Sequence, residues 1–478
     1  MSQFTQLLGS RLGLEELVEA VEPAPAEDTV LDGSDTVEGV NSEVLEATAE
    51  VEQSEALVDE LQQGGDTLDE VAAVLESAIK MDGGLDPIAA KFCKIAIESA
   101  TRKIGIGSTM TASLENIGVG NAKLQATRVT LENIQEKLKG WWRALVTAMV
   151  SLYNKVKAMV ASIFDLLPKI KERAQALLKA AGEAKGEAKE PKFKSNLVSG
   201  LRIANALPSG ADVIKGMDML AFHGLAVIGA KSATANAAIL ADLSSVVANL
   251  GDKLDQAKID GLCKTIFDKL VSRAKEYGAS KDGNDAKYGS DESDVKISQT
   301  YIGGVVIAVK SPKSLKDSDG KAFPANRLVR QSGASLEDAF KGEKAIPDGE
   351  LDTLTLDQIK ELAKHVVDLC TTSMECKATF ANRDAERAKL TVVVNKAIDA
   401  ASKGTEGEGS GELIKAVQSG GDALQTYWSK AVSFESKFLG YVTKTMQAAL
   451  GYGTTSLKQY GGEAAKTEEP KKEEAPAA

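Results

Sequence analysis

The stretch Trp141-Trp-Arg-Ala-Leu-Val-Thr-Ala-Met-Val-Ser-Leu-Tyr-Asn-Lys-Val-Lys-Ala-Met-Val-Ala-Ser-Ile-Phe-Asp-Leu-Leu167 decides the fold class of this chain. Its apolar side chains recur at the spacing of one helix face, and they are Trp142, Leu145, Met149, Leu152, Val156, Met159, Ile163 and Leu166. A helix with so broad an apolar face must bury it against something. Arg143, Lys155 and Lys157 interrupt the stretch, and a membrane span needs about 20 apolar residues with few charges. The pattern therefore favours burial against a partner, or adsorption at a surface, over crossing a bilayer.

The composition of the whole chain also favours helices. Hydrophobic residues make up 43% of the 478 residues, but aromatic residues only 5%, so the cores are aliphatic and rich in alanine. Such cores are typical of helix bundles rather than β-sandwiches. We expect a mainly α protein of two to four compact units, a multi-segment helical bundle with a small β-hairpin insertion.

Cysteine and histidine are too sparse for a metal site. The four cysteines, Cys93, Cys263, Cys370 and Cys376, form no CxxC pair, and the chain has only two histidines. We expect four buried thiols in a reducing compartment. The first residues lack a basic start followed by an apolar core, as a secretory signal would have, and no later run is clean enough to span a bilayer. The sequence predicts a soluble protein.

Charge is distributed unevenly along the chain. Residues 1–85 contain 21 acidic and two basic side chains, a net charge of −19, so the remainder carries +7 of the total of −12. A long block of like charge usually stays solvated and extended. By composition alone it is an ordinary disordered acidic tail; the functional interpretation is a removable or scaffold-interacting leader, whose loss leaves a basic protein.

Breaks in the helical pattern divide the chain into segments. Residues 1–98 are predicted as the acidic leader, disordered or loosely helical, with a possible docking peptide at 1–20 and a helix break at Gly64-Gly65. Helix is expected from Asp86-Pro87 to Arg102 and again from Asn121. The other predicted segments are a loop with the long amphipathic helical region at 99–181, a linker at 182–193, a helical body at 194–403, a linker at 404–411, C-terminal helices at 412–460 and a disordered tail at 461–478.

A β-hairpin is predicted inside the helical body, at residues 295–310. Val295–Ile302 alternates, Gly303-Gly304 has the composition of a two-residue turn, and Val305–Lys310 is rich in β-branched residues. Because an isolated hairpin is marginal in water, we expect it to pack on helices or to pair with another short strand near residues 327–330.

No catalytic constellation stands out. Gly105-Ile-Gly107-Ser-Thr is the nearest approach to a phosphate loop, but it lacks both the full GxGxxG pattern and the GxxxxGK[ST] lysine. His223 and His365 have no nucleophile nearby in the sequence, and no pair of carboxylates is singled out by its spacing. We predict no enzymatic activity, no metal and no cofactor.

A family resemblance is carried by two short motifs and the helix after them. Thr109-Met-Thr-Ala-Ser-Leu-Glu115-Asn-Ile-Gly118, then Thr127-Arg-Val-Thr-Leu-Glu-Asn-Ile134 and the Trp-rich helix, resemble internal head proteins of giant tailed bacteriophages. The hairpin and the later helices resemble that group in order and type. The resemblance implies a non-enzymatic virion structural protein inside the capsid, soluble in the host cytoplasm before assembly, whose partners are phage head or scaffold proteins.

The resemblance also implies processing by a prohead protease, which cuts after a glutamate in a small-or-aliphatic-x-Glu context. Ala96-Ile97-Glu98 and Ser113-Leu114-Glu115 fit this context, as do Leu14-Glu15-Glu16 and Leu17-Val18-Glu19, which would trim only a short peptide. Such triplets also occur by chance, as at Ser335-Leu336-Glu337. A cut after Glu98 or Glu115 gives a virion-derived protein that begins near Ser99 or Asn116.

Two contacts are weighed beside this structural role. The basic remainder predicts contact with packaged DNA that does not depend on base sequence, although mixed Lys and Glu on solvated helices is the simpler interpretation of any single residue. The alternative function is a membrane-active or ejected protein that acts through the 141–167 amphipathic helix at a bilayer interface.

Overall fold

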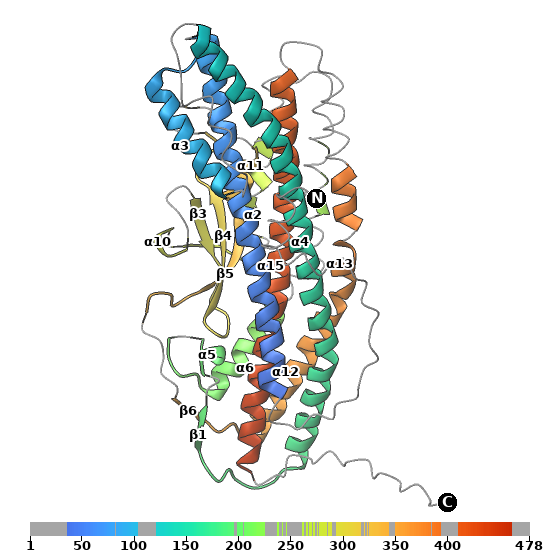
Figure 1. Cartoon of the computed structure of the whole chain (residues 1–478). Helices are drawn as coiled ribbons and strands as arrows, with labels where there is room; N and C mark the ends of the chain where they lie inside the picture. Colours follow the sequence, from blue (N-terminus) through green and yellow to red (C-terminus); the bar gives the residue numbers. More distant parts are fainter. Residues whose placement is uncertain are drawn as a thin grey trace, which may run out of the picture. The chain divides into compact units, whose positions relative to one another are not determined.

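The computed structural model describes residues 36–81, 83–103, 121–195, 198–203, 205–224, single positions between 237 and 275, and residues 277–283, 285–288, 293–316, 320, 323, 325–343, 349–383, 385–392 and 410–460. These residues are mainly helical, with two small antiparallel sheets (Figure 1), which confirms the predicted fold class. Two compact units divide them: unit 1 includes residues 45–158, and unit 2 includes residues 36–44 and those from 159 onward. The predicted disordered tail at 461–478 lies outside the described residues.

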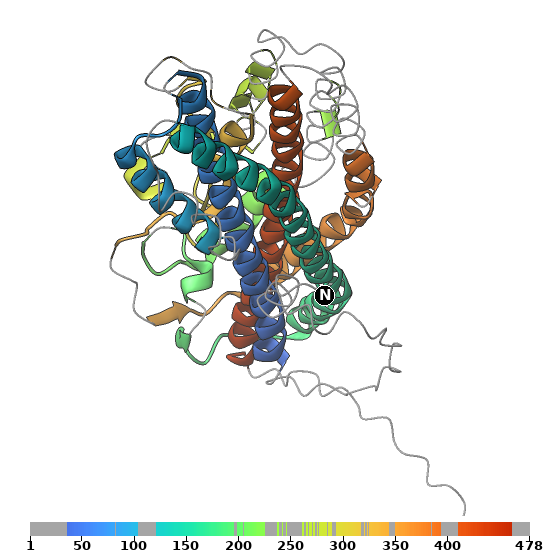
Figure 2. The same ribbon diagram turned by 45° about the horizontal axis from the view of Figure 1, so that its top comes forward.

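The described residues of unit 1 form three helical segments. They are α2 (Thr36–Met81) from residue 45 onward, α3 (Pro87–Lys103) and the first part of α4 (Asn121–Glu183). Within the unit α2 and α4 lie side by side, and α3 turns back beside α2 (Figures 1 and 2). Aliphatic side chains from all three helices are almost fully buried, among them Val51, Leu61, Leu68, Leu75, Ile97, Ile134 and Leu145. Part of the predicted leader therefore shares a core with the helix that follows it.

The predicted helix break at Gly64-Gly65 is wrong, because α2 runs through it without interruption. The reason is the aromatic side chain that packs there. A Cβ added at Gly65 would lie 2.2 Å from Cζ2 of Trp141, so only a glycine lets the indole lie directly against the α2 backbone. The Trp141 Nε1–H donates to the Leu61 carbonyl at 2.7 Å. Gly65 serves a close helix contact rather than a turn.

The predicted helix starts at Pro87 and Asn121 are confirmed. Before α3, the Asp86 carboxylate accepts hydrogen bonds from the backbone N–H groups of Ile88 and Ala89, at 2.8 and 2.9 Å, and these bonds lower its pKa. The Leu85 N–H donates to Thr127 Oγ1 at 3.0 Å, which ties this turn to α4. The sequence signal at the start of α3, Asp86 followed by Pro87, acts locally.

Unit 2 is organised around α15 (Ser410–Lys458), which is buried on nearly all sides from residue 420 to residue 450. It packs against α5 (Val198–Leu201), α11 (Ala325–Arg330) and α12 (Leu356–Glu375). The predicted C-terminal helical region is thus one long helix. α12 begins at a capping box formed by Thr355 and Gln358, and it packs on α6 (Gly210–Met219), after which the chain continues as a π-helix, η3 (Leu220–Gly224).

A four-stranded antiparallel sheet contains the predicted hairpin. Its order is β2 (Lys281–Asp282), β3 (Ser293–Ile297), β4 (Val305–Pro312) and β5 (Gly333–Asp338). β3 pairs with β4 in the register Ile297↔Ala308, so the hairpin is confirmed, although its loop is longer than the two predicted glycines. The predicted partner strand near 327–330 is wrong: those residues lie in α11, and β5, just after it, pairs with β4.

A second sheet, of two strands, contradicts the prediction for the middle of the chain. β1 (Lys192–Ser195) pairs with β6 (Gly349–Asp352), where the sequence predicted a linker to residue 193 and helix from 194. Phe193 is buried and its ring lies 5.9 Å from that of Tyr452. Four residues are too few for periodicity to distinguish a strand from a linker, and the pairing partner lies far away in the sequence. Two short helices complete the described elements, α10 (Asp285–Tyr288) and α13 (Lys377–Ala381).

Candidate functional site

The apolar face predicted from the opening stretch is covered by the chain's own fold. Seven of its eight positions are at most 8% exposed: Leu145, Met149, Leu152, Val156, Met159, Ile163 and Leu166. The side chain of the eighth, Trp142, lies outside the described residues. A helix face with this spacing needs burial, and these seven side chains are buried. No helix among the described residues is long and apolar enough to cross a membrane.

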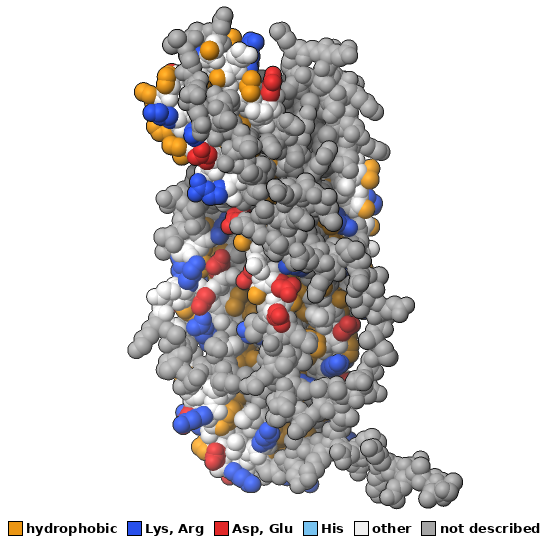
Figure 3. All heavy atoms as spheres, viewed as in Figure 1, with side chains coloured by type: hydrophobic (Ala, Val, Ile, Leu, Met, Phe, Trp, Pro, Cys, Tyr) orange, Lys and Arg blue, Asp and Glu red, His pale blue; other side chains and the backbone are white. Residues whose placement is uncertain are grey.

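A different helix presents an apolar face to solvent. On α3, Ile88, Phe92 and Ile95 are 71%, 69% and 64% exposed. They recur at intervals of four and three residues, so they form one stripe along the helix, and Figure 3 shows hydrophobic side chains gathered over α3. We call these three residues the α3 stripe.

The opposite side of α3 holds it in unit 1. Ala90, Cys93, Ile97 and Ala100 are at most 6% exposed, so α3 is apolar on two sides and only one of them is used in the core. Exposed basic side chains, Lys91 and Arg102, flank the α3 stripe. Isolated exposed apolar side chains need no explanation, but a stripe of three large ones on one helix face is typical of an interaction site.

One candidate cleavage site lies on this helix. Glu98 is inside α3, where its carboxylate lies 3.8 Å from Lys94 Nζ, and the preceding Ile97 is fully buried. A protease needs an accessible, extended chain, so the Ala96-Ile97-Glu98 bonds are protected as long as α3 is folded. Glu16, Glu19 and Glu115, the other candidates, lie outside the described residues.

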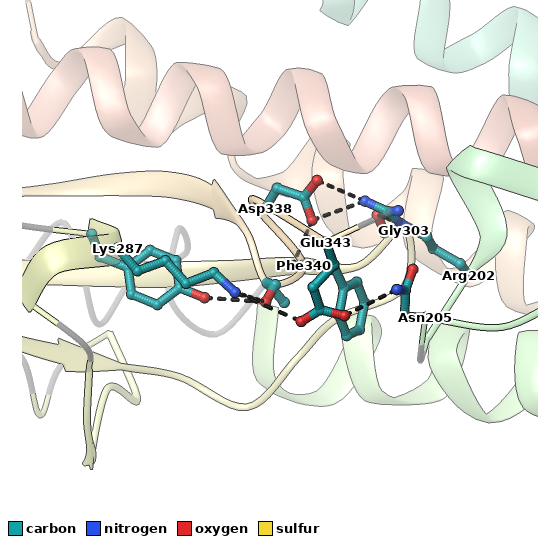
Figure 4. A network of polar contacts seen from close by, with 9 residues as sticks. Arg202, Asn205, Lys287, Gly303, Asp338, Phe340 and Glu343 are labelled. Carbon is teal, nitrogen blue, oxygen red and sulfur yellow. Dashed lines mark hydrogen bonds and ion pairs between the residues drawn. The ribbon is translucent and has the colours of Figure 1, made fainter. Parts of the chain in front are cut away.

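The hairpin loop of unit 2 is clamped by a polar network (Figure 4). Both Asp338 carboxylate oxygens accept from Arg202 Nη2 at 2.8 Å, and the Arg202 guanidinium lies 5.3 Å from the centroid of the Phe340 ring. Gly303 and Gly304 have φ values of +83° and +74°, and a Cβ at Gly304 would meet Arg202 Nε at 2.7 Å. The two glycines are required by the backbone and by the guanidinium above them.

The rest of the network extends the clamp to α10. Glu343 accepts from Asn205 Nδ2 at 2.9 Å and lies 4.0 Å from Lys287 Nζ, while Lys287 Nζ donates to the Ala339 carbonyl at 2.6 Å. Each carboxylate here faces a cation or an amide. Charges paired in this way hold segments together, and the network has the character of a structural joint between sheet and helices rather than of an acid–base site.

A second ionic cluster is buried on α15. Arg383 is 1% exposed; its Nη2 pairs with Glu435, which is fully buried, and its Nη1 lies 2.7 Å from Glu386 Oε2. Burial lowers the pKa of the Arg383 guanidinium, but the two carboxylates outweigh that effect and raise the pKa above its ordinary value. The pair is charged and depends on both partners.

Three of the four predicted buried thiols are confirmed. Cys93, Cys370 and Cys376 are free and buried, and burial raises the pKa of all three, that of Cys370 to about 12. Such thiols stay protonated and unreactive at neutral pH. Cys263 lies outside the described residues.

His365 is the histidine whose side chain lies in the part of the chain that the structure describes. His365 Nδ1 lies 3.2 Å from Asp218 Oδ1, and the His223 side chain lies outside that part. The same residues contain no group of three or more His, Cys, Asp or Glu side chains that could hold a metal ion. The Gly105-Ile-Gly107 segment is also outside them.

Of these features, the α3 stripe was missed as a site, since the sequence predicted a helix there without an exposed face. Ile88, Phe92 and Ile95 share a face that does not coincide with Ala90, Cys93 and Ile97. Two separate apolar faces on one short helix are the signal that could have found it.

Comparison with known proteins identifies a family for the chain. A family model described as phiKZ-like phage internal head proteins matches residues 46–454. Neither a curated protein nor a solved structure matches the chain. The matched range begins in α2 and ends in α15, so it includes nearly all the described helices.

Proposed function

The chain belongs to the phiKZ-like phage internal head proteins and is therefore a structural protein of the bacteriophage head interior; from that premise we propose how it acts there. It is packaged as a folded helical protein, its N-terminus is trimmed, and it contacts the packaged DNA. The family match over residues 46–454 is the observation that carries this proposal. The long helices of the chain support a structural rather than a catalytic role. The polar clusters of unit 2 support it too, because their charged side chains pair with one another and join elements of the fold.

Processing is proposed to trim the chain before α2. Residues 46–98 contribute buried side chains to unit 1, and the Trp141 indole donates to Leu61 across that core. A cut after Glu98 requires α3 to unfold, and a cut after Glu115 would leave α2 and α3 held by the core. Cleavage after Glu16 or Glu19 removes a short peptide and leaves the packed helices covalently intact.

Mass spectrometry of protein from purified particles tests this proposal. We expect N-terminal peptides that begin at Leu17 or Ala20, together with peptides from residues 46–98. A new terminus at Ser99 in particles that have lost residues 46–98 would overturn the trimming proposal. Intact Met1 or Ser2 in mature particles would overturn processing altogether.

Contact with DNA is proposed through a local basic segment. The last turns of α4 and the chain that leads into β1 carry exposed lysines, namely Lys169, Lys179, Lys185, Lys189, Lys192 and Lys194. Lysines that neutralise phosphates release counterions, so affinity falls steeply as salt rises and does not depend on base sequence.

DNA binding is measured with the full chain and two duplexes of unrelated sequence. We expect equal affinities for both duplexes and a salt slope that becomes less steep when the exposed Lys179, Lys185 and Lys189 are replaced by Gln. Lys360, which lies on α12 outside this segment and pairs with Asp357 at 3.1 Å, is the control for substitution by Gln. Binding that is unaffected by the triple substitution would place the DNA contact elsewhere or exclude it.

The membrane-active alternative remains a separate proposal with its own test. It requires the 141–167 helix to leave the core that buries its apolar face, at the cost of exposing that face to water. Binding of the full chain to anionic vesicles, with exposure of Leu152 to a membrane-phase quencher after a Trp substitution there, would support it. Partnership with scaffold proteins and with a prohead protease is likewise proposed from family membership alone.

A further inference from the structure

The α3 stripe has the size and spacing of a binding site for one helix. Ile88, Phe92 and Ile95 follow the i, i+4, i+7 pattern by which an amphipathic helix engages a partner helix. Three large side chains, each about two-thirds exposed, present an apolar patch on the order of a few hundred Å². A stable dimer of folded proteins buries roughly 800 Å² on each partner, so the stripe fits a peptide segment better than the flat face of a second folded body.

The chain itself contains a segment of matching character, residues 4–18. Its apolar residues are Phe4, Leu7, Leu8, Leu12, Leu14, Leu17 and Val18, enough for one apolar helix face. Glu15 and Glu16 lie within it, and Glu19 and Glu22 follow it. The α3 stripe is flanked by the exposed cations Lys91 and Arg102. Opposite charges at the rim of an apolar contact favour association and fix its register.

The length of the connecting chain decides whether the contact forms within one molecule. α2 contains 46 residues and rises about 1.5 Å per residue. The distance along α2 from Thr36 to the part of α2 beside the α3 stripe is therefore roughly 50–60 Å. The 17 residues between Val18 and Thr36 span roughly 60 Å only when fully extended, whereas their ordinary end-to-end distance is about 23 Å. Docking within one chain would therefore require a nearly taut linker, while docking onto a neighbouring molecule would not.

We propose that the α3 stripe binds residues 4–18 of a second copy of this chain. The contact is an exchange between copies, in which each chain offers one stripe and one segment. Where trimming after Glu16 or Glu19 takes place, a point that rests on the proposed function, it removes the segment and releases the stripe. The association itself is a property of the untrimmed chain and is tested without the protease.

Sedimentation velocity of the full-length chain over a range of concentrations tests the proposal, with three single variants. Leu8→Glu places a charge in the segment and Phe92→Glu places one in the stripe. Val392→Glu, at a side chain that is 51% exposed elsewhere, is the matched control. Because Phe92 is 69% exposed, its substitution leaves the core intact, and circular dichroism confirms the fold of each variant.

We expect the wild-type chain and the control to associate alike, and Leu8→Glu and Phe92→Glu each to weaken association at least tenfold. Mixing the two weakened variants restores one segment-to-stripe contact and therefore partial association. Loss of association in Phe92→Glu but not in Leu8→Glu would overturn the choice of occupant, since the stripe would then meet another surface. A wild-type chain that stays monomeric would overturn the proposal as a whole. So would a Phe92→Glu variant that self-associates like the wild type but binds phosphatidylglycerol vesicles more weakly.

Discussion

Replacing Gly65 by Ala tests whether the predicted leader is really part of the unit 1 core. In a solvated helix interior this change raises stability by about 1 kcal/mol, because alanine loses less conformational freedom than glycine. In α2 the new Cβ would lie 2.2, 2.3 and 2.7 Å from three ring atoms of Trp141, whereas carbon atoms in contact are about 3.5–4.0 Å apart. The packing term therefore opposes the helix-propensity term.

The packing term is the larger of the two. Trp141 is 6% exposed and its Nε1–H is fixed to the Leu61 carbonyl at 2.7 Å, so the indole must move by more than 1 Å and weaken that bond. Overpacking of a well-packed core costs about 1–3 kcal/mol, and loss of the hydrogen bond adds about 1 kcal/mol. After the gain of about 1 kcal/mol from propensity, we expect unit 1 of Gly65→Ala to be less stable by about 1–3 kcal/mol.

Urea denaturation followed by circular dichroism measures the change, and amide hydrogen exchange in α2 assigns it to unit 1. Exchange data are needed because a chain of two units need not unfold in a single step. Gly182→Ala is the matched control: Gly182 is also helical, in α4, and a Cβ there has no atom within 4 Å, so its stability should stay the same or rise.

A double-mutant cycle isolates the contact. In a Trp141→Ala background the clash is gone, so Gly65→Ala should then be neutral or stabilising, with a coupling free energy of about 1–3 kcal/mol between the two positions. If Gly65→Ala proved as stable as the wild type, or if its effect were the same with and without Trp141, the indole would not lie on α2 and the shared core would be refuted.

Three further changes probe other parts of the structure. Arg383→Met removes the cation that pairs with the buried carboxylate of Glu435 and should cost about 3–5 kcal/mol, much of which Arg383→Met/Glu435→Leu should recover in thermal denaturation. Backbone hydrogen bonds lower the pKa of Asp86, so its contribution to stability is present above its unfolded pKa of about 3.9 and is lost as pH falls through the lower folded pKa; an acid titration of Asp86→Asn should lack that loss. Gly304→Ala forces a side chain into a φ of +74° and against Arg202 Nε, and should destabilise the sheet of unit 2 by about 1–3 kcal/mol, measured by hydrogen exchange in β4.

Sequence reasoning succeeded where the determining signal is local. The start of α3 is set by Asp86 and Pro87, and the buried face of α4 is set by its helical spacing. It failed where a distant residue decides. Gly64-Gly65 resembles a turn until Trp141 is placed against it, and Lys192–Ser195 resembles a linker until β6 pairs with it. The conformations of the glycine pair and of the four-residue strand are decided by partners about 75 and 160 residues away, and no short window of sequence contains those partners.

The acidic block also has a different meaning in the folded chain. Its net charge of −19 predicted an extended leader, but α2 carries acidic side chains such as Glu50, Glu52, Glu60 and Glu70 on its exposed side while Val51, Leu61 and Leu68 pack inside. Amphipathic burial offsets the repulsion between like charges, which water and salt screen on an exposed face.

Retaining α2 changes how the protein can meet DNA. Removal of residues 1–19 takes away three acidic side chains and one basic side chain and leaves a net charge of −10, not the +7 left by losing the whole acidic block. A net negative charge gives the chain no overall attraction to DNA, and charges farther apart than the Debye length of about 10 Å at 0.1 M salt are largely screened from one another. Any attraction must then come from a local group such as the exposed lysines between 169 and 194. Affinity should therefore depend on those few lysines and on their screening by salt, and deleting residues 2–19 should change it little. A large gain in DNA affinity on that deletion would contradict this expectation. It would show that the acidic N-terminal segment shields the basic one, so that N-terminal trimming would itself control DNA binding.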